Sequence, residues 1–317
     1  MLSNAWKTDN FKLVQKAFKY EYSKNMSELK LMLGEFSANA VDYAMQGLGG
    51  YGEYQEYNGS TLNQATERRG FLTVLTPKEY NLTVDITRKM AKIDKEGEIA
   101  RTGAKLARGG FMSVYLKALR MFSAAYTGDI LGGDGKAWAA TDHPVASKGS
   151  ENRTSIVDSD AGTFSNLIAD KLSVAAITKA QTMARNMVTP DGLPTMVKLD
   201  TILVSAENEA IAKKLFGVDN KWTPVNDPES AENGANPVSG LRYVVVSDGG
   251  VGLTDYQWAI CDRRLMQETA GIVYNEKPTV LRTELDNPLI DRYVGYMDYT
   301  VGFGDARPII FSNGSGS

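Results

Sequence analysis

The sequence predicts an α+β fold, and three patterns along the chain carry this prediction. Apolar residues recur at helical spacing in two segments, 11–22 and 111–125. Residues 80–86 instead alternate strictly between apolar and polar side chains, which is the period of a half-buried strand. In the last third, short apolar runs between residues 201 and 261 flank a further helical segment. No internal repeat is visible, so we expect one large domain or two or three mixed sub-domains.

The composition is that of an ordinary soluble globular protein, with 43% hydrophobic and 23% charged residues among 317. A net charge of −3 does not favour a protein that grips phosphates. Cys261 and His143 are the only cysteine and histidine, which excludes an intramolecular disulfide and most zinc sites. The first residues lack the apolar region of a signal peptide, and no apolar run is long enough to span a membrane. We therefore expect a protein made and kept in a cytoplasm.

An amphipathic helix is expected near the N-terminus, with Asn10 as its N-cap. Its apolar stripe consists of Phe11, Val14, Phe18 and Tyr22. A basic face, which favours either solvent or a subunit interface, carries Lys7, Lys12, Lys16, Lys19 and Lys24. A second helical turn is predicted from Ser27 to Leu33, with Gly34 as its end.

The segment 47–59 is rich in glycine and tyrosine and is predicted to be irregular or extended. Two strands follow, at residues 70–75 and 80–88, and the Pro77-Lys78 step between them suits a turn. One face of the second strand would carry Tyr80, Leu82, Val84 and Ile86. We expect these strands to pair as a long ribbon. An isolated ribbon is marginal in water, so its apolar face needs a cover, which another subunit could supply.

The longest helix is predicted after this ribbon. The positive end of the helix dipole favours the carboxylates at its start, which are Asp94, Glu96 and Glu98. The apolar stripe runs from Phe111 to Ala125, the helix ends near Gly128, and Gly109-Gly110 predicts a bend in its middle. Residues 127–163 form a long segment of low regularity, and such segments usually have a function or mediate contacts.

The rest of the chain mixes helices and strands. Helices are predicted at 164–187 and 207–216. Strands are predicted at 201–204, 242–246 and 258–261. Extended, tyrosine-rich chain is expected at 291–310, and the Gly/Ser-rich residues 313–317 predict a flexible tail.

The reactive side chains do not favour an enzyme. Asp142 precedes His143 and could orient a catalytic base, but adjacent side chains in an extended loop point apart, and no partner nucleophile is indicated. A structural hydrogen-bonding role for His143 is therefore preferred, with catalysis by Asp142 and His143 as the alternative. The glycine-rich run 132–136 lacks the spacing of a phosphate loop, and Cys261 lies in an apolar strand. No catalytic, cofactor-binding or metal-binding residue is predicted.

Several short motifs occur in order along the chain. They are Tyr43-Ala44-Met45-Gln46-Gly47-Leu48-Gly49, Tyr54-Gln55-Glu56-Tyr57-Asn58-Gly59, Glu79 to Ile86, Asp142-His143-Pro144, Asp200 to Val204 with Glu207 to Ala210, and Asp291-Arg292-Tyr293 with Gly302 to Pro308. In this order they resemble the major capsid proteins of tailed bacteriophages, and in particular the Mu-type major head subunit branch. The resemblance covers nearly the whole chain.

The resemblance implies the tailed-phage major capsid fold. Residues 1–50 would be an N-terminal arm, and 51–93 an extended hairpin (the E-loop) that lies across a neighbouring subunit. Residues 94–163 would form a peripheral P-domain with a long spine helix, and 164–289 a central A-domain with a mixed sheet and flanking helices. Residues 290–317 would supply the closing strands of the P-domain and the tail.

The resemblance also implies a structural protein rather than an enzyme. Copies of the chain would form pentamers and hexamers of an icosahedral shell, which encloses double-stranded DNA without sequence-specific binding. This virion capsid would assemble in the bacterial host cytoplasm, with separate scaffold, portal and decoration proteins as partners and with no cofactor or membrane. An encapsulin-type nanocompartment shell shares the fold and is the alternative function.

Subunit contacts are expected at Tyr51, Tyr54, Tyr57, Arg68, Arg69, Lys78, Tyr80 and Lys89. Some relatives crosslink an E-loop lysine to an asparagine of a neighbour, and Lys78 and Lys89 are available for such a bond. The Arg68-Arg69 pair follows Glu67, which fits a solvated or intersubunit ion pair.

Overall fold

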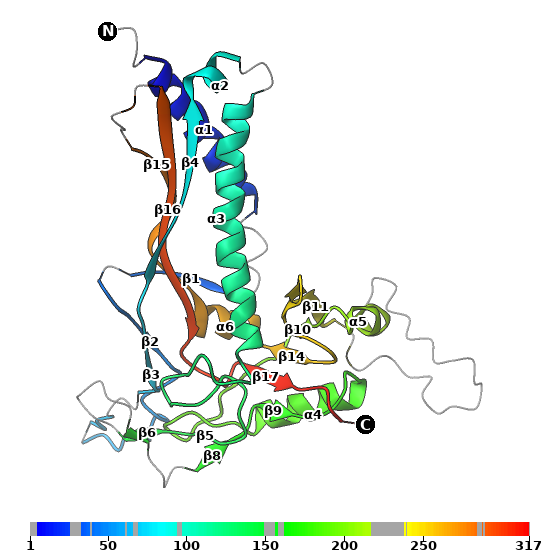
Figure 1. Cartoon of the computed structure of the whole chain (residues 1–317). Coiled ribbons are helices and arrows are strands. Elements are labelled where there is room, and N and C mark those ends of the chain that lie inside the picture. Colours follow the sequence, from blue (N-terminus) through cyan, green and yellow to red (C-terminus); the bar gives the residue numbers. More distant parts are fainter. Residues whose placement is uncertain are drawn as a thin grey trace. The chain divides into compact units, whose positions relative to one another are not determined.

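The computed structural model in Figure 1 describes residues 5–25, 33–38, 40–60, 62–65, 69–93, 97–148, 156–157, 162–216, 238, 240–283, 287 and 289–316. The chain forms two compact units, and each unit is assembled from separated segments. Unit 1 consists of Met1–Tyr43, Leu75–Ala118 and Ile272–Val301. Unit 2 consists of Ala44–Val74, Leu119–Gly271 and Gly302–Ser317.

Unit 1 combines helices with a four-stranded sheet (Figure 1). The helices are α1 (Ala5–Asn25), α2 (Arg88–Ile93) and most of α3 (Glu98–Ser123). The sheet order β1-β15-β16-β4 corresponds to Gly34–Ser37, Ala270–Thr283, Ile290–Phe303 and Lys78–Thr87. β4 and β16 are antiparallel, with a continuous register from Lys78 opposite Tyr299 to Thr87 opposite Ile290.

The core of unit 1 joins both helices to the sheet. Its buried cluster contains Val14, Phe18, Ile86, Ile99, Leu106, Ala107, Val280 and Tyr293. α1 and α3 lie backbone to backbone at Gly103, where a Cβ atom would lie only 2.4 Å from the carbonyl oxygen of Val14. Only glycine fits this helix crossing, because any side chain there would overlap the backbone of α1.

Unit 2 contains a five-stranded sheet of order β11-β10-β14-β17-β9. These strands are Arg242–Val245, Thr201–Val204, Trp258–Cys261, Ile309–Ser312 and Leu167–Ile168. β10 is parallel to β11 and antiparallel to β14, whereas β17 is antiparallel to β14 and parallel to β9. The helices of this unit are α4 (Val174–Arg185), α5 (Glu209–Phe216) and α6 (Arg263–Thr269). Buried residues of α4, α5, β10 and β14 form one apolar cluster.

Short two-stranded ribbons complete the fold. They are β2 (Tyr43–Gln46) with β3 (Leu72–Leu75), β5 (His143–Pro144) with β8 (Thr163–Phe164), β6 (Ser147–Lys148) with β7 (Ile156–Val157), and β12 (Ser247–Asp248) with β13 (Val251–Gly252).

The N-terminal helix is confirmed, with two corrections. Val14 and Phe18 are buried in the core as the stripe predicts. However, α1 begins at Ala5, so Asn10 lies inside the helix and is not its N-cap. Lys7 is not on a solvated face: its side chain is buried, and its Nζ donates to the carbonyl oxygen of Ile290 at 3.2 Å. Most of the second predicted turn, 27–32, lies outside the described residues.

The strands predicted at 70–75 and 80–88 are confirmed, but their expected pairing is wrong. β3 pairs with β2, and β4 pairs with β16. Ile86 on the apolar face of β4 is buried in the core of unit 1, while Leu82 remains 53% exposed. The cover of this face therefore comes mainly from the same chain. A sheet partner more than 200 residues away offers β4 a longer register than the four residues of β3.

The long helix is confirmed at Glu98–Ser123, and α3 runs without a break through Gly109-Gly110. Asp94 and Glu96 lie outside the described residues. The helix predicted at 164–187 is correct only from Val174, because Ser173 is the N-cap and accepts a hydrogen bond from the Ala176 amide. Before it lie two short strands, Thr163–Phe164 and Leu167–Ile168, and the second joins the edge of the unit 2 sheet.

The predicted elements at 201–204, 242–246, 258–261 and 207–216 are confirmed within one or two residues. The helix α6 and the long strand β15 had not been predicted. The expected flexible tail instead follows the edge of the sheet. The Asn313 amide donates to the carbonyl oxygen of Ile168 at 3.2 Å, and the Gly316 amide donates to that of Ala169.

Candidate interaction surfaces

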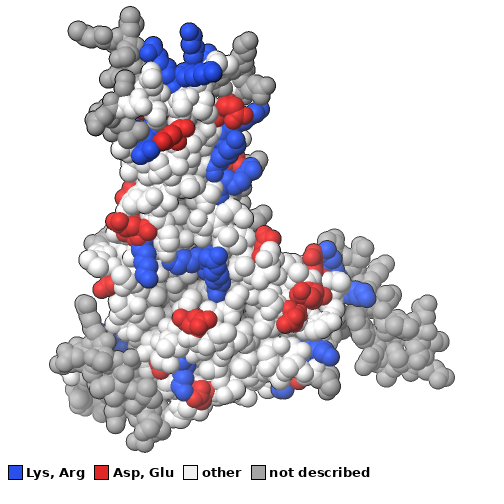
Figure 2. All heavy atoms as spheres, viewed as in Figure 1, with Lys and Arg blue, Asp and Glu red and all other residues white. Residues whose placement is uncertain are grey.

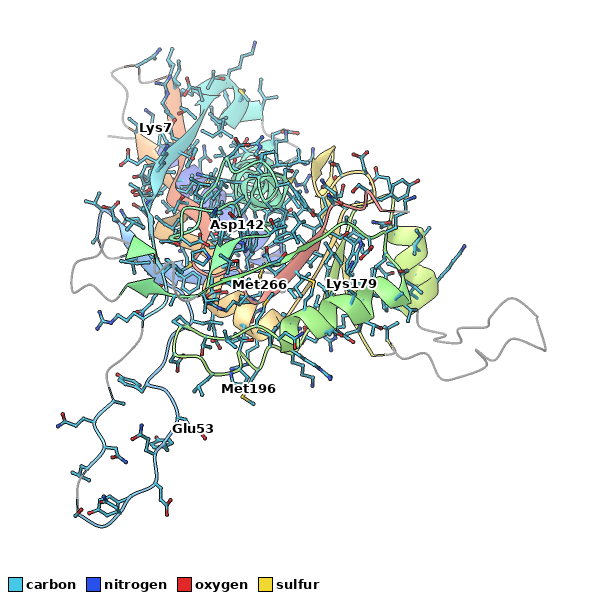
Figure 3. All side chains as sticks on the ribbon, turned by 90° about the horizontal axis from the view of Figure 1, so that it is seen from below. Lys7, Glu53, Asp142, Lys179, Met196 and Met266 are labelled. Atoms are coloured by element: carbon cyan, nitrogen blue, oxygen red, sulfur yellow. The ribbon has the colours of Figure 1, made fainter. Side chains whose placement is uncertain are left out.

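The most exposed apolar side chains of unit 2 include those of a loop at residues 51–60 and 62–65, which we call the tyrosine loop. Tyr54 is fully exposed, and Tyr51, Tyr57 and Leu62 are at least 60% exposed. Figure 3 shows this loop, which carries Glu53, projecting away from the neighbouring elements of its unit. A monomer rarely leaves several large apolar side chains together in water, so this loop is a candidate contact surface.

The tyrosine loop has internal order although it contains no helix or strand. Asn63 donates from Nδ2 to the carbonyl oxygens of Gln55 at 3.4 Å and Glu56 at 3.3 Å, which joins the two sides of the loop. Near its tip, Asn58 accepts from the amide and the hydroxyl of Ser60. These bonds give the exposed tyrosines a defined framework rather than a random chain.

The tyrosine loop is joined to the rest of unit 2 by a narrow neck. The Gly47 amide donates to the carbonyl oxygen of Phe71 at 2.8 Å, which continues the pairing of β2 and β3. A Cβ atom on Gly70 would lie 2.5 Å from the carbonyl carbon of Gly47, so the two chains cross with backbone against backbone. The Leu48 amide donates to Asp305 Oδ2 at 2.8 Å, and the Gly52 amide donates to Asp191 Oδ2 at 3.0 Å.

The predicted contact residues fall into two groups. Tyr51, Tyr54 and Tyr57 share the tyrosine loop, and Arg69 is exposed beyond it in unit 2. Lys78, Tyr80 and Lys89 belong to unit 1 instead. Arg68 lies outside the described residues. The described contact candidates therefore belong to two different units, and they do not lie on one continuous E-loop hairpin.

Tyr80 is engaged inside its own chain. Lys117 Nζ donates to its hydroxyl at 2.6 Å, and the same ammonium lies 4.7 Å from the centre of its ring. The ring of Tyr299 is the second neighbour, at 5.0 Å between ring centres. These contacts leave Tyr80 half-buried, so it is less suited to a subunit contact than the loop tyrosines.

Lys78 and Lys89 are exposed, at the start of β4 and on α2 respectively. Arg88, Lys89 and Lys92 together make α2 a basic surface, and Figure 2 shows Lys and Arg side chains gathered at this end of unit 1. Elsewhere on the visible face, acidic and basic side chains are interspersed. Such mixing does not favour a phosphate-gripping surface on that face.

His143 is fully buried, and its Nδ1 lies 2.6 Å from Asp134 Oδ2. Its ring stacks on Phe164, with 5.1 Å between ring centres. Asp142 is exposed and pairs with Lys136, which lowers the pKa of the Asp142 carboxyl through its hydrogen bond. The two adjacent side chains therefore serve different partners, and the carboxylate that contacts His143 is Asp134, which sequence analysis had not singled out.

Nothing else in the described part of the chain has the arrangement of a reactive site. Cys261 is buried in β14, and burial raises the pKa of its thiol, which keeps it protonated. No group of three or more His, Cys, Asp or Glu side chains that could hold a metal ion occurs among the described residues. Among those same residues, no helix has the length and apolar character needed to cross a membrane.

The buried polar groups that organise unit 2 had not been predicted either. Asp305 and Arg307 form an ion pair with 3.0 Å between Oδ2 and Nη1, and both side chains are buried. Asn166 is fully buried and donates to the carbonyl oxygens of Trp138, Ala306 and Ile309. The segment Gly302 to Pro308 was noticed only as part of a motif, because nothing in a single sequence distinguishes a buried arginine from a surface one.

Comparisons with known proteins give a consistent result. A family model described as phage capsid protein matches residues 72–310. The capsid of Ralstonia phage GP4 has 13% identity and a TM-score of 0.52, with 89% of this chain and 87% of that chain covered. The holo-SrpI encapsulin complex from Synechococcus elongatus PCC 7942 has 7% identity and a TM-score of 0.50, with 89% and 85% covered. No curated protein matches the chain. At these identities the likeness to the solved structures is one of fold.

Proposed function

Because the chain belongs to the phage capsid protein family and has the tailed-phage major capsid fold, we propose that it is a Mu-type major head subunit. As a structural capsid protein it contributes to the shell of a virion. In this proposal, pentamers and hexamers of the chain close into an icosahedral shell around double-stranded DNA, within the cytoplasm of the bacterial host. Separate scaffold, portal and decoration proteins take part in assembly.

The observation that carries this proposal is the tyrosine loop. Tyr51, Tyr54 and Tyr57 stand in solvent on an ordered loop whose neck is fixed to unit 2 by Asp305 and Asp191. Tyrosine is enriched at protein interfaces because it buries a large apolar ring and still offers a hydroxyl. A shell subunit spreads its stability over many shared contacts, which explains why such a loop is left uncovered in one chain.

We assign the regions of the chain as follows. Residues 1–50 are the N-terminal arm, 51–93 the E-loop region, 94–163 with 290–317 the P-domain, and 164–289 the A-domain. Within the E-loop region, the part that reaches a neighbour is the tyrosine loop, because β4 is occupied by β16 of its own chain. The α3 helix is the spine of the P-domain. Strands β9, β10, β11 and β14 of the mixed five-stranded sheet lie in the A-domain, and β17 of the same sheet comes from the closing segment 290–317.

Contacts with neighbouring subunits are proposed at the three loop tyrosines, at Arg69, and at the exposed lysines Lys78 and Lys89. Arg68 remains a candidate outside the described residues. Tyr80 is the weakest candidate because Lys117 and Tyr299 already engage it. The near-neutral balance of 35 basic and 38 acidic residues suits a wall that meets DNA without sequence-specific binding.

An encapsulin-type shell is the second candidate, because the fold is also that of a solved encapsulin. Cargo distinguishes the two functions: a DNA-filled particle with a portal supports the phage shell, and a co-purified enzyme inside the particle supports the encapsulin. The catalytic alternative has lost its geometric basis, since Asp142 pairs with Lys136 and His143 is closed off from solvent.

The test is assembly of the purified chain, separated by size and imaged by negative-stain electron microscopy with and without co-expressed scaffold. Closed shells, or rings of five or six subunits, are expected for the parent chain. Replacing Tyr51, Tyr54 and Tyr57 by serine should abolish them and leave a folded, unassembled chain. The exposed Tyr256, replaced by serine in the same unit, is the matched control and should still assemble. Normal shells from the triple variant would refute the proposed contact.

A further inference from the structure

The buried Asp305–Arg307 pair stands out because burial of two charges is costly. Both side chains are no more than 3% exposed. Taking an ion pair out of water costs free energy that its mutual attraction often fails to recover, so apolar residues would stabilise such a site at least as well. A pair kept in this position is therefore expected to fix a geometry, and its contacts indicate which one.

Asp305 holds the neck of the tyrosine loop. Its Oδ2 accepts from the Leu48 amide at 2.8 Å and from Arg307 Nη1 at 3.0 Å, while its Oδ1 accepts from the Arg307 amide at 2.9 Å. The space for this carboxylate depends on Gly47, where a Cβ atom would lie 2.9 Å from Oδ2. The Asp305 carboxylate is thus held in place by hydrogen bonds from the loop and from the Arg307 guanidinium.

Arg307 also donates hydrogen bonds to two further segments of the chain. Its Nε donates to the carbonyl oxygen of Val188 at 2.9 Å, and its Nη2 donates to that of Val145. The guanidinium also lies over the ring of Phe164, 4.7 Å from its centre. A planar fork with donors in several directions is needed for this set of contacts, and a lysine ammonium could not supply it.

The segment after Val188 forms the second anchor of the loop. It turns tightly, with the Gly192 amide donating to the carbonyl oxygen of Thr189 at 2.9 Å. The turn presents Asp191, whose Oδ2 accepts from the Gly52 amide at 3.0 Å. The loop is therefore hydrogen-bonded at Leu48 by Asp305 and at Gly52 by Asp191. Arg307 binds Asp305 directly, and it also binds the carbonyl oxygen of Val188, just before the turn that carries Asp191.

We propose that Arg307 and Asp305 are positioning residues that fix the direction in which the tyrosine loop projects from the rest of unit 2. This inference rests on the proposed function, in which the loop contacts a neighbouring subunit. The pair acts by joining the neck at Leu48 to the turn before Asp191, so that the loop presents its tyrosines in one orientation. A pair that only stabilised the core would instead affect all of unit 2 alike.

Spin-label distances in the unassembled full chain test the direction of the loop. Nitroxides are placed at Glu56→Cys in the loop and at Thr178→Cys on the exposed face of α4, both in unit 2. The native Cys261 is buried and stays unlabelled. The parent chain should give one narrow distance distribution, and Arg307→Lys should widen it roughly twofold or more because the loop samples several directions.

Arg282→Lys is the matched control, because Arg282 donates from Nε to the buried Asp291 at 2.8 Å in unit 1 and has no part in the neck. It should leave the distribution narrow. An unchanged distribution in a folded Arg307→Lys chain would overturn the inference. Equal acceleration of hydrogen exchange throughout unit 2, including β10 and β14, would also overturn it, since that is the mark of a purely structural pair.

Asp191→Ala keeps the test decisive if Arg307→Lys fails to fold, because Asp191 is only half-buried and alanine removes the oxygen that accepts from the Gly52 amide. This variant should widen the distribution, and an unchanged width would count against the inference. Because the distances are measured without assembly, they are independent of the proposed function. A chain that gives a narrow distance distribution but never forms shells would contradict the proposed function and still support the positioning role.

Discussion

Gly103 is the position in α3 where a single methyl group should have the largest effect on unit 1. In Gly103→Ala the added Cβ would lie 2.4 Å from the carbonyl oxygen and 3.1 Å from the carbonyl carbon and Cα of Val14. All three are backbone atoms of α1, so no side chain can rotate away. The helix α1 must withdraw by about 1 Å to restore ordinary contact distances.

The magnitude follows from two opposing effects. Alanine is favoured over glycine in a helix interior by about 1 kcal/mol. Overpacking of a tight contact costs about 1–3 kcal/mol, and withdrawal of α1 also loosens Val14 and Phe18, which are buried against the same core. We expect the clash to dominate, so that Gly103→Ala lowers the free energy of unfolding by up to about 2 kcal/mol after the gain in helix propensity is subtracted.

Gly110→Ala is the matched control on the same helix. Its added Cβ would lie 3.7 Å from Pro278 Cβ, an ordinary contact, so only the helix propensity changes. This variant should stabilise the chain by about 1 kcal/mol. The two variants are compared in urea unfolding of the unassembled chain, with hydrogen exchange of the α1 amides as a local readout. If Gly103→Ala is as stable as Gly110→Ala, the crossing of α1 and α3 is not as described.

Three further outcomes are expected. Burial raises the pKa of Tyr22 to about 12, so the folded state keeps a proton that the unfolded state loses near pH 10. The contribution of Tyr22 to the free energy of unfolding should be fully present below pH 10 and lost as the pH rises through about 12. In urea unfolding at a series of pH values, Tyr22→Phe should lose less stability above pH 10 than the parent. The same loss in both chains would contradict this. The hydrogen bond from Arg292 lowers the pKa of Asp85, so the pair's small contribution is present above pH 3.8 and lost as the pH falls through the folded-state value. The free energy of unfolding of Asp85→Asn should equal that of the parent in acid and be slightly lower at neutral pH. An equal difference at both pH values would show that the ion pair is not the cause of the difference. Asn166→Asp should destabilise by about 2–5 kcal/mol, because a buried carboxylate would face three carbonyl oxygens; a thermal unfolding midpoint close to that of the parent would refute this.

The sequence by itself determined those elements whose cause is local. The stripe of α1 follows from helical periodicity, and Val14 and Phe18 are buried as it predicts. The strict alternation of residues 80–86 identified β4, and the apolar run 201–204 identified a fully buried strand. The irregular chain at 51–58 also followed from sequence, because its glycines and the absence of periodicity favour neither helix nor strand. The exposure of Tyr51, Tyr54 and Tyr57 is seen only in the structure.

Only the tertiary structure decided which segments are partners. β4 reads as a strand from its own residues, but its choice of β16 over β3 depends on which edge lies within reach after the chain folds. Lys7 lies in the basic stripe of α1, yet it is buried because the Ile290 carbonyl oxygen accepts from its ammonium. Periodicity cannot carry this information, since it describes a face and not what covers that face.

The same limit applies to the neck of the tyrosine loop. Asp191, Asp305 and Arg307 have no distinguishing spacing, and Leu48 and Arg307 are separated by most of the chain. Their roles arise because folding removes water from the two opposite charges, after which each charge must find hydrogen-bond partners among the backbone groups nearby. The sequence therefore determined that an irregular, tyrosine-rich segment exists, whereas the tertiary structure decided that it is exposed and where it is anchored, because burial and donor direction are properties of the folded chain alone.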